Sequence, residues 1–313
     1  MTGARFLLML LIAGSSPLGA QEGRRLALTF DDLPVAGPVP RADRAEVFAR
    51  LLGALKNERV PAIGFVNESQ FRAAGKVDGS EVAWLRAWLG AGLELGNHTF
   101  SHSDLHRMTL AAYETDVLAG DSSIRSLLRE EGKSPRYFRH PYLHTGRSLA
   151  VRDSLVDFLQ LHGYLVAPVT DDNSDWIYAA ALERALARQD STTARRIREA
   201  YVPYMEEKLE YWERQSVTLF GREIPQILLL HANRLNADGL GALLAMIRGR
   251  GYRLISLTEA LRDSAWTTPD LYAGPAGISW LHRWALSRDR HSVLREEPAV
   301  PPWVLEAAGV ESE

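Results

Sequence analysis

Apolar residues along the chain recur with two alternating periods, one typical of strands and one typical of helices. Leu26, Leu28 and Phe30 alternate with Ala27 and Thr29, and this spacing of two predicts a strand that ends at an Asp pair. A helical spacing follows over residues 45–57, and a second strand is predicted over residues 60–66. Because strands that alternate with helices pair in parallel, about seven such units predict an α/β barrel of parallel strands rather than an open sheet.

The same reading assigns the remaining elements. Helices are predicted at 80–90 (with Ser80 as the cap), 109–131, 148–162 and 240–248, and strands at 93–96, 137–139, 164–170, 226–231 and 252–257. Two stretches break the alternation: residues 178–221 predict a helical insertion, and residues 264–313 predict a C-terminal extension that packs on the barrel. We therefore expect a catalytic domain over residues 24–263.

The first twenty residues differ in composition from the rest. A weakly basic start is followed by an apolar run over residues 6–13 and then by small residues up to Ala20. This run is too short to span a bilayer, so residues 1–20 predict a signal peptide and a secreted or periplasmic protein. A retained membrane anchor is the alternative, although no stable membrane insertion is expected from the remaining sequence.

Composition excludes several classes of function. The formal net charge is −3 and no long basic run occurs, which argues against a nucleic-acid-binding surface. There is no cysteine, so the chain has no disulfide framework and no thiolate nucleophile. Any metal ion must therefore be held by nitrogen and oxygen ligands.

Ionisable residues follow five of the predicted strands. They are Asp31 and Asp32, His98 and His102, Arg139, Asp172 and Asp175, and His231. Each has an ordinary structural explanation by itself: an Asp pair often forms a turn, and histidines four residues apart often lie on a solvated helix face. In a parallel barrel, however, the carboxyl ends of all strands open on one rim, where active sites are built. The occurrence of these residues after five strands therefore predicts a functional site at this rim.

The residue types in this set suggest hydrolytic metal chemistry. Two imidazoles and one carboxylate form a three-ligand set that leaves a coordination position open for water. We expect His98 and His102 to lie one helical turn apart, so that both can point at the same ion. One Asp of the pair can bind the ion while the other acts as a general base, and His231 can protonate a leaving amine with Asp175 as its charge partner.

From Ala27 to Leu261 the chain resembles the polysaccharide deacetylases with a NodB homology domain, carbohydrate esterase family 4. Five segments carry the resemblance in order: Thr29-Phe30-Asp31-Asp32, His98-Thr-Phe-Ser-His102, Arg139-His-Pro141-Tyr142, Asp172-Asn-Ser-Asp175-Trp176 and Leu228-Leu-Leu-His231. The resemblance implies the family's distorted (β/α) barrel. It also implies one divalent metal ion, with zinc as the first expectation.

The resemblance further implies a role for each matched residue. Asp32, His98 and His102 would hold the metal. Asp31 would be the base and Arg139 would orient it, while His231 would be the acid and Asp175 its charge partner. The Tyr142 N–H would stabilise the oxyanion, and the substrate would contact Trp176, Pro141 and Tyr142. The expected partner is an acetylated glycan. The chain departs from the family where Leu33 and Leu143 replace a usual Gly and Ala232 replaces a usual Asp, which puts the substrate in doubt. His106 and His144 match no motif and are read as polar rim residues.

The function expected from these residues is hydrolysis of carbon–nitrogen bonds other than peptide bonds. A secreted metal-dependent deacetylase would remove N-acetyl groups from a GlcNAc-containing glycan, either chitin-like or peptidoglycan. A sugar O-acetyl esterase or a small-amide hydrolase on the same fold is an alternative. A glycan-binding relative without turnover is another, since Leu33 and Leu143 could narrow the cleft.

Overall fold

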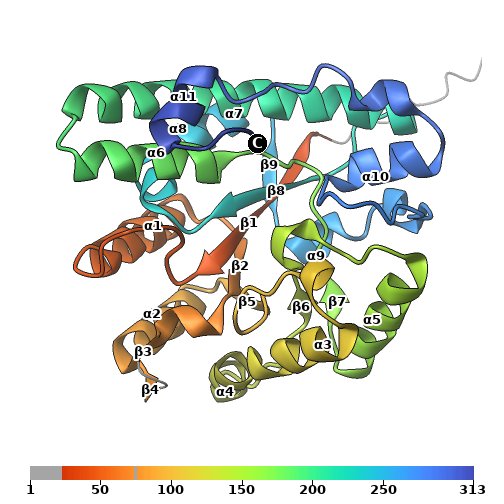
Figure 1. Cartoon of the computed structure of the whole chain (residues 1–313), viewed down its shortest axis with the longest axis horizontal. Helices are drawn as coiled ribbons and strands as arrows, with labels where there is room; N and C mark the ends of the chain where they lie inside the picture. Colours follow the sequence, from red (N-terminus) through yellow and green to blue (C-terminus); the bar gives the residue numbers. More distant parts are fainter. Residues whose placement is uncertain (1–22, 74–75) are drawn as a thin grey trace, which may run out of the picture.

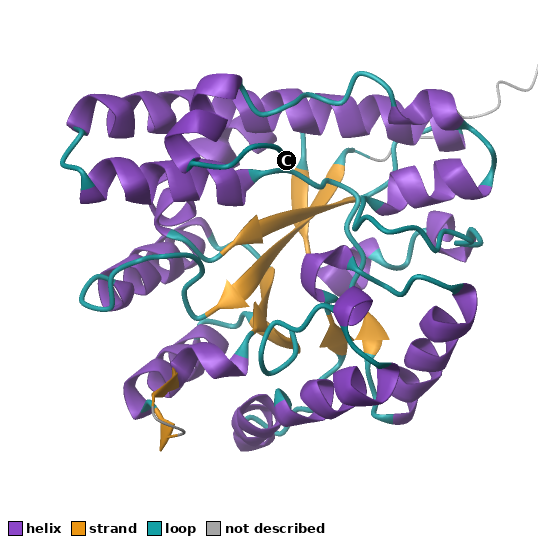
Figure 2. Cartoon of the chain, in the orientation of Figure 1, coloured by secondary structure: helices purple, strands orange, loops and turns teal. Residues whose placement is uncertain are grey.

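A curved parallel sheet lies at the centre of the fold in the computed structural model, which describes residues 23–73 and 76–313 (Figures 1 and 2). The signal peptide predicted for residues 1–20 falls outside the described residues. The strands are β1 (Arg25–Leu33), β2 (Ala62–Val66), β5 (Glu94–Asn97), β6 (Tyr137–Phe138), β7 (Leu165–Val166), β8 (Gln226–His231) and β9 (Arg253–Ile255). Their order is β7-β6-β5-β2-β1-β8, with β9 also paired to β1, and every pairing is parallel. This confirms the predicted distorted (β/α) barrel of parallel strands.

The sheet curls so that its two ends approach each other. β8 pairs with one edge of β1 from Leu26 to Asp31, while β9 and β2 share the opposite edge. The chain that leaves β7 then forms an isolated parallel bridge from Asp171 to Leu228 of β8. Since all strands run in the same direction, their carboxyl ends, and the loops that follow them, open at one rim.

Helices surround the sheet, with α1 to α5 along one side of it and α6, α7 and α11 along the opposite side in Figure 1. Their bounds are α1 (Arg44–Glu58), α2 (Gly79–Gly90), α3 (Leu110–Ala119), α4 (Ser122–Glu130), α5 (Leu149–Leu161), α6 (Asp175–Ala187), α7 (Ser191–Phe220), α8 (Arg234–Gly249), α9 (Leu257–Ala260), α10 (Trp280–Ser287) and α11 (Pro302–Ala308). β3 (Arg72–Ala73) and β4 (Lys76–Val77) form a separate antiparallel pair. Among the described helices, none has the length and apolarity needed to cross a membrane.

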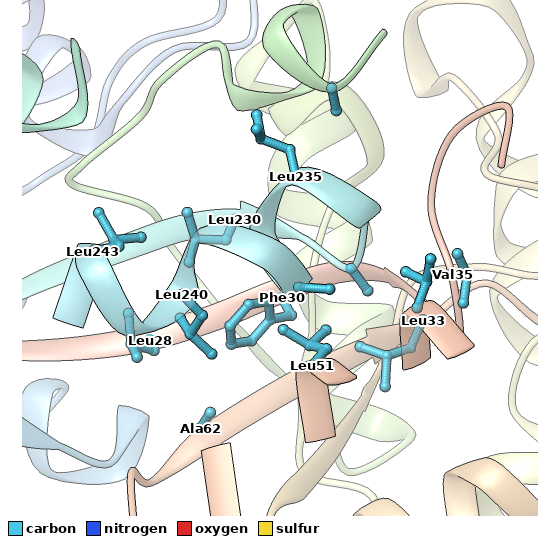
Figure 3. Close-up of a cluster of buried hydrophobic side chains, with 14 of the residues drawn as sticks. Leu28, Phe30, Leu33, Val35, Leu51, Ala62, Leu230, Leu235, Leu240 and Leu243 are labelled. Atoms are coloured by element: carbon cyan, nitrogen blue, oxygen red, sulfur yellow. The ribbon is translucent and has the colours of Figure 1, made fainter. Parts of the chain in front are cut away.

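The alternation along β1 divides its side chains between two apolar clusters. Leu28 and Phe30 pack against α1 and α8, where Figure 3 shows Phe30 beside Leu51 and Leu240. Ala27 points to the other face of the sheet and joins the cluster inside the barrel. Each fully buried Leu or Phe of this kind stabilises the fold by roughly 1.5–3 kcal/mol. β1 is therefore covered on both faces, which fixes the position of the residues at its carboxyl end.

The helix predicted over residues 109–131 is two helices, α3 and α4, separated at Gly120 and Asp121. The apolar stripe continues through this break, so periodicity did not reveal it. Gly120 lies against the loop after β5: a Cβ at Gly120 would be 2.4 Å from the carbonyl carbon of Thr99 and 2.6 Å from the nitrogen of Phe100. The lack of a side chain at Gly120 therefore leaves the space in which that loop packs.

Two further local predictions needed correction. Asp78, not Ser80, caps α2, because the Asp78 carboxylate accepts a hydrogen bond from the Ser80 backbone at 3.0 Å. The strand predicted over residues 164–170 is reduced to β7 and the single bridge at Asp171. Each correction changes where an element begins or ends and leaves the order of elements intact.

The stretch predicted as a helical insertion contains most of α6 and all of α7, and the C-terminal extension contains α10 and α11. Trp280 and Trp284 of α10 pack in one apolar cluster with Trp212 of α7. Val304 of α11 joins the larger core cluster together with Leu182 of α6. The extension is therefore packed against the helices, while the domain bounds at residues 24–263, 178–221 and 264–313 stay predictions.

Candidate active site

Three predicted metal ligands lie together at the rim of the barrel. Asp32 is near the end of β1, and His98 and His102 lie in the loop after β5. Asp32 Oδ1 is 3.8 Å from His98 Nε2 and 3.6 Å from His102 Nε2. One candidate ligand atom from each residue lies within 4.8 Å of the other two. The three side chains thus converge on a common point.

The two histidines reach this point from an irregular loop. Thr99 and His102 have positive φ angles of 64° and 54°, so the prediction that His98 and His102 lie one helical turn apart is wrong. The Thr99 amide donates to Asn97 Oδ1 at 2.7 Å, which turns the chain directly after β5. Residues that curl a loop in this way bring side chains four positions apart together without a helix.

The chemistry of the three side chains fits a divalent ion. His98 Nδ1 donates a hydrogen bond to the Arg139 carbonyl at 2.9 Å, which leaves the lone pair of Nε2 directed at Asp32. Burial, with the neighbouring His102, lowers the pKa of His98 to about 3, so its imidazole is neutral, as a ligand must be. Asp32 Oδ1 is buried and accepts no hydrogen bond from the described residues. Two imidazole nitrogens and one carboxylate oxygen are ligands that suit zinc.

Asp31 lies beside this cluster with a different set of neighbours. Its side chain is almost fully buried, and Oδ2 lies 3.5 Å from Arg139 Nη1 and 3.8 Å from His98 Nε2. Burial raises the pKa of Asp31, while the guanidinium of Arg139 opposes the rise. Arg139 is itself fully buried and donates to Thr29 Oγ1 at 3.0 Å. A carboxylate whose proton affinity is raised is suited to act as a base.

His231 faces Asp31 across the pair of strands, because β1 and β8 are in register at these two residues. His231 Nδ1 donates to Asp175 Oδ1 at 2.6 Å, and the His231 amide donates to Asp175 Oδ2 at 2.9 Å. Burial lowers the pKa of His231, but the Asp175 carboxylate outweighs it and raises that pKa to about 10. His231 is therefore held as a cation with Nε2 available to donate a proton.

Two supporting residues were not found from the sequence. Asn236 donates to Asp175 Oδ2 at 2.6 Å and to the His231 carbonyl at 2.8 Å, which fixes both partners of the ion pair. Thr29 accepts the hydrogen bond from Arg139 described above. In the sequence, only its position two residues before Asp31 pointed to the site. Asn236 lies in the first turn of the helix that follows His231, and this position is the signal that could have identified it.

The residues expected to contact the substrate differ in their exposure at the rim. Tyr142 is 55% exposed, and its ring centroid is 4.5 Å from that of His102. Trp176, at the start of α6, is 43% exposed. Pro141 is buried and begins a short 3-10 turn, so its position does not favour the predicted contact with substrate. Its ring instead shapes the turn that carries Tyr142.

His106 and His144, predicted to be polar rim residues, form a second cluster with Asp104. The two imidazole rings are stacked with centroids 3.9 Å apart, and His144 Nδ1 donates to Asp104 Oδ1 at 2.7 Å. His106 uses both of its nitrogens, because Nδ1 donates to the Pro275 carbonyl and Nε2 accepts from the Gly146 amide, each at 3.2 Å. Hydrogen bonding therefore accounts for this cluster, which joins two rim loops.

Residues 19–163 match a family model described as polysaccharide deacetylase. A chitooligosaccharide deacetylase from Bradyrhizobium sp. (strain ANU 289) is 33% identical over 119 residues, which are 38% of this chain and 46% of that protein. A chitin deacetylase from Colletotrichum lindemuthianum is 29% identical over 130 residues, which are 42% of this chain and 46% of that protein. The chain thus spans about half the length of the curated relatives it matches.

Solved structures give the same assignment of fold. The chitin deacetylase from the fungal pathogen Colletotrichum lindemuthianum superposes with a TM-score of 0.52 at 22% identity, covering 76% of this chain and 88% of that one. A CE4 family pseudoenzyme from Bacillus anthracis superposes with a TM-score of 0.51 at 16% identity, covering 77% and 66%. At these identities the likeness concerns the fold alone. The family model over residues 19–163 and the curated relatives show that this part of the chain is similar to polysaccharide deacetylases.

Proposed function

We propose that this protein is a secreted or periplasmic metal-dependent hydrolase that removes N-acetyl groups from a GlcNAc-containing polysaccharide or oligosaccharide, either chitin-like or peptidoglycan. The observation that carries the proposal is the convergence, at one rim, of a three-ligand cluster with a buried carboxylate on one side and a charged imidazole on the other. The relatives' names, chitooligosaccharide deacetylase and chitin deacetylase, favour the same bond and substrate class.

Asp32, His98 and His102 would hold the ion, for which zinc fits the two nitrogens and one oxygen. When bound, such an ion supplies Lewis-acid polarisation of the acetyl carbonyl and makes water a stronger nucleophile at neutral pH. The remaining steps belong to side chains and amides of the chain itself.

Asp31 is placed to accept the proton of the attacking water. Its buried carboxylate has a raised pKa, and Arg139 at 3.5 Å holds it in one orientation. Attack on the acetyl carbon converts the carbonyl oxygen into an oxyanion. We assign the Tyr142 amide as the donor to that oxyanion, because Tyr142 lies at the same rim with its ring centroid 4.5 Å from that of His102.

His231 completes the reaction on the opposite side. As the carbon–nitrogen bond breaks, the sugar nitrogen takes the proton from His231 Nε2 and leaves as an amine, with acetate as the other product. Asp175 stabilises the cationic imidazole before this transfer and fixes the direction of Nε2 through its bond to Nδ1 at 2.6 Å. The two proton-transfer groups thus lie on different strands, β1 and β8.

A non-catalytic relative is the second candidate, because one structural neighbour is a pseudoenzyme. The presence here of the acid, the base and all three ligands weighs against it. An O-acetyl esterase or small-amide hydrolase would use the same side chains on a different bond.

Acetate release from chito-oligosaccharides, peptidoglycan and acetylated xylan, measured in parallel, separates these possibilities. We expect release from at least one N-acetylated glycan and a loss of the acetyl mass by mass spectrometry. Asp31→Asn and His231→Ala should each lose that activity, whereas Asp153→Asn, at an exposed site on α5, should keep it. No turnover on any N-acetylated substrate would rule out the deacetylase proposal.

A further inference from the structure

We infer that the C-terminal segment from Pro275 to Trp284 is a structural part of the active site, in which Gly277 is a positioning residue for Tyr142. The inference rests on the proposed function, in which the Tyr142 amide and ring lie beside the reacting groups. Its basis is a set of contacts between this segment and the loop after β6, which are separated by more than a hundred residues in the sequence.

The loop after β6 has an unfavourable backbone conformation at two consecutive residues. Tyr142 and Leu143 have φ angles of 57° and 53°, in the left-handed region that favours glycine. Neither residue is glycine, so contacts from outside the loop must stabilise the conformation. Leu143 supplies one such contact, since its side chain is 5% exposed and packs in an apolar cluster with Trp280 and Trp284 of α10.

Gly277 lies directly against the backbone of this loop. A Cβ at Gly277 would be 1.7 Å from the Tyr142 carbonyl oxygen, 2.8 Å from the Tyr142 carbonyl carbon and 3.1 Å from the Leu143 carbonyl carbon. Those neighbours are backbone atoms, which cannot rotate away as a side chain can. Gly277 has no positive φ, so glycine is required here for space and not for conformation.

The segment is anchored to the rim at both of its ends. The Pro275 carbonyl accepts from His106 Nδ1 at 3.2 Å, which ties it to the loop that also carries His102. Beyond Gly277, Ser279 Oγ donates to the Thr170 carbonyl at 2.7 Å, and the Trp280 amide donates to the Val169 carbonyl at 2.8 Å. Gly277 therefore cannot withdraw from the loop without breaking these contacts.

A third direct link joins the segment to the loop. Arg283, which is almost fully buried, donates to Thr145 Oγ1 at 2.8 Å and is paired with Asp270 at 2.6 Å. Thr145 itself is buried and follows Tyr142 by three residues. The extension thus holds the loop through steric contact at Gly277, apolar packing at Leu143 and a hydrogen bond at Thr145.

The function of this support is to place Tyr142. Its ring is 4.5 Å from that of His102, and its amide is the donor proposed for the oxyanion. A methyl group on Gly277 must push the Tyr142 carbonyl away, and displacement of a reacting group by about 1 Å can lower turnover about a hundredfold. We therefore expect Gly277→Ala to lower kcat by roughly tenfold to a hundredfold and to change KM by less than about twofold.

The test compares Gly277→Ala with Gly241→Ala in the full-length, zinc-loaded protein. Gly241, in α8, is a matched control because a Cβ there meets nothing within 4 Å and its φ is ordinary. Three quantities are measured: kcat and KM on the best glycan, zinc content by elemental analysis, and amide hydrogen exchange of residues 139–148. We expect Gly277→Ala alone to lower kcat and to speed exchange in the loop, with zinc content unchanged.

Thr145→Val provides a second variant that adds no bulk, in case Gly277→Ala does not fold. It removes the hydrogen bond from Arg283 and should also speed exchange over residues 139–148. If neither variant speeds that exchange relative to Gly241→Ala, or if kcat of Gly277→Ala equals that of the control, the inference is wrong. If the parent protein releases no acetate, the proposed function fails, and the exchange comparison still decides whether the extension holds the loop.

Discussion

Replacing Asp175 with Asn removes the charge that keeps His231 protonated while leaving the shape of the side chain intact. The carboxylate is fully buried and accepts from His231 Nδ1, the His231 amide and Asn236 Nδ2. An Asn in its place can accept some of these bonds, but its NH₂ group must then face one of the donors. We expect the protein to fold with reduced stability and His231 to lose its cationic form near neutral pH.

The structure gives the size of the effect. Burial lowers the pKa of His231, but the Asp175 carboxylate, with smaller contributions from Asp32 and Asp31, raises it from 6.5 to about 10. Without the carboxylate the pKa should fall toward its ordinary value of 6.5, because burial then opposes the charge and only Asp32 and Asp31 still favour it. A full return to 6.5 would change the free-energy difference between the two protonation states by roughly 5 kcal/mol. At pH 7 the protonated fraction of His231 would then fall from nearly all to about a quarter or less. Proton donation to the leaving amine should fall with it.

The same shift makes a prediction about stability. Since the pKa of His231 is higher in the folded than in the unfolded protein, its contribution is complete below pH 6.5 and disappears as the pH rises through about 10. The difference in free energy of unfolding between the parent and Asp175→Asn should therefore be largest near pH 6 and smaller above pH 10. Urea denaturation of the metal-free proteins at the two pH values measures it.

Nuclear magnetic resonance of histidine-labelled, metal-free protein follows the titration of His231 directly. Asp153→Asn is the control, because the Asp153 side chain is 62% exposed and has no contact with His231 among its hydrogen bonds and ion pairs. An imidazole of His231 that still titrates above about pH 8 in Asp175→Asn would refute the reasoning, since another group would have to hold the charge.

Three further outcomes are expected. His102→Ala should reduce the zinc content measured by elemental analysis from about one equivalent to near zero, whereas His291→Ala, at an exposed site, should leave it unchanged. Full zinc occupancy in His102→Ala would show that His102 is not a ligand. Asp31→Asn should keep the zinc but lower kcat by about 10²–10⁴-fold in acetate-release assays, and an unchanged kcat would exclude it as the base. Gly120→Ala should weaken zinc binding in competition with a chelator, because its Cβ would meet the Thr99 backbone at 2.4 Å and displace the loop that carries His98 and His102. An unchanged zinc affinity would show that this loop can move without disturbing the ligands.

Much of the site could be predicted from the sequence because of where its residues stand relative to the strands. An apolar run with a spacing of two marks a strand in any context, and parallel strands bring their carboxyl ends to the same rim. Asp31 ends an alternating run and His231 ends a continuous aliphatic run, so strand direction predicted that both lie at the same rim. Their direct pairing became known only from the register of β1 and β8. The barrel and its order of elements were predictable for the same reason.

The geometry around those strand ends depended on tertiary contacts. Periodicity cannot show that residues 109–131 break at Gly120, because the apolar stripe continues through the break and the close contact of Gly120 with the Thr99 backbone is a tertiary contact. A spacing of four suggested a helical turn for His98 and His102, whereas positive φ angles in an irregular loop bring them together. Such angles are set by packing around the loop and leave no repeating pattern in the sequence.

The sequence by itself determined which chemical groups this protein has and at which rim they lie, because hydrophobic period and strand direction are local properties of the chain. Only the tertiary structure decided how the groups are held: the stacking of His106 on His144, the support of Asp175 by Asn236, and the contact of Gly277 with the loop of Tyr142. These pairs join segments that no local pattern relates. Their distances follow from how the helices and loops pack once the barrel has formed.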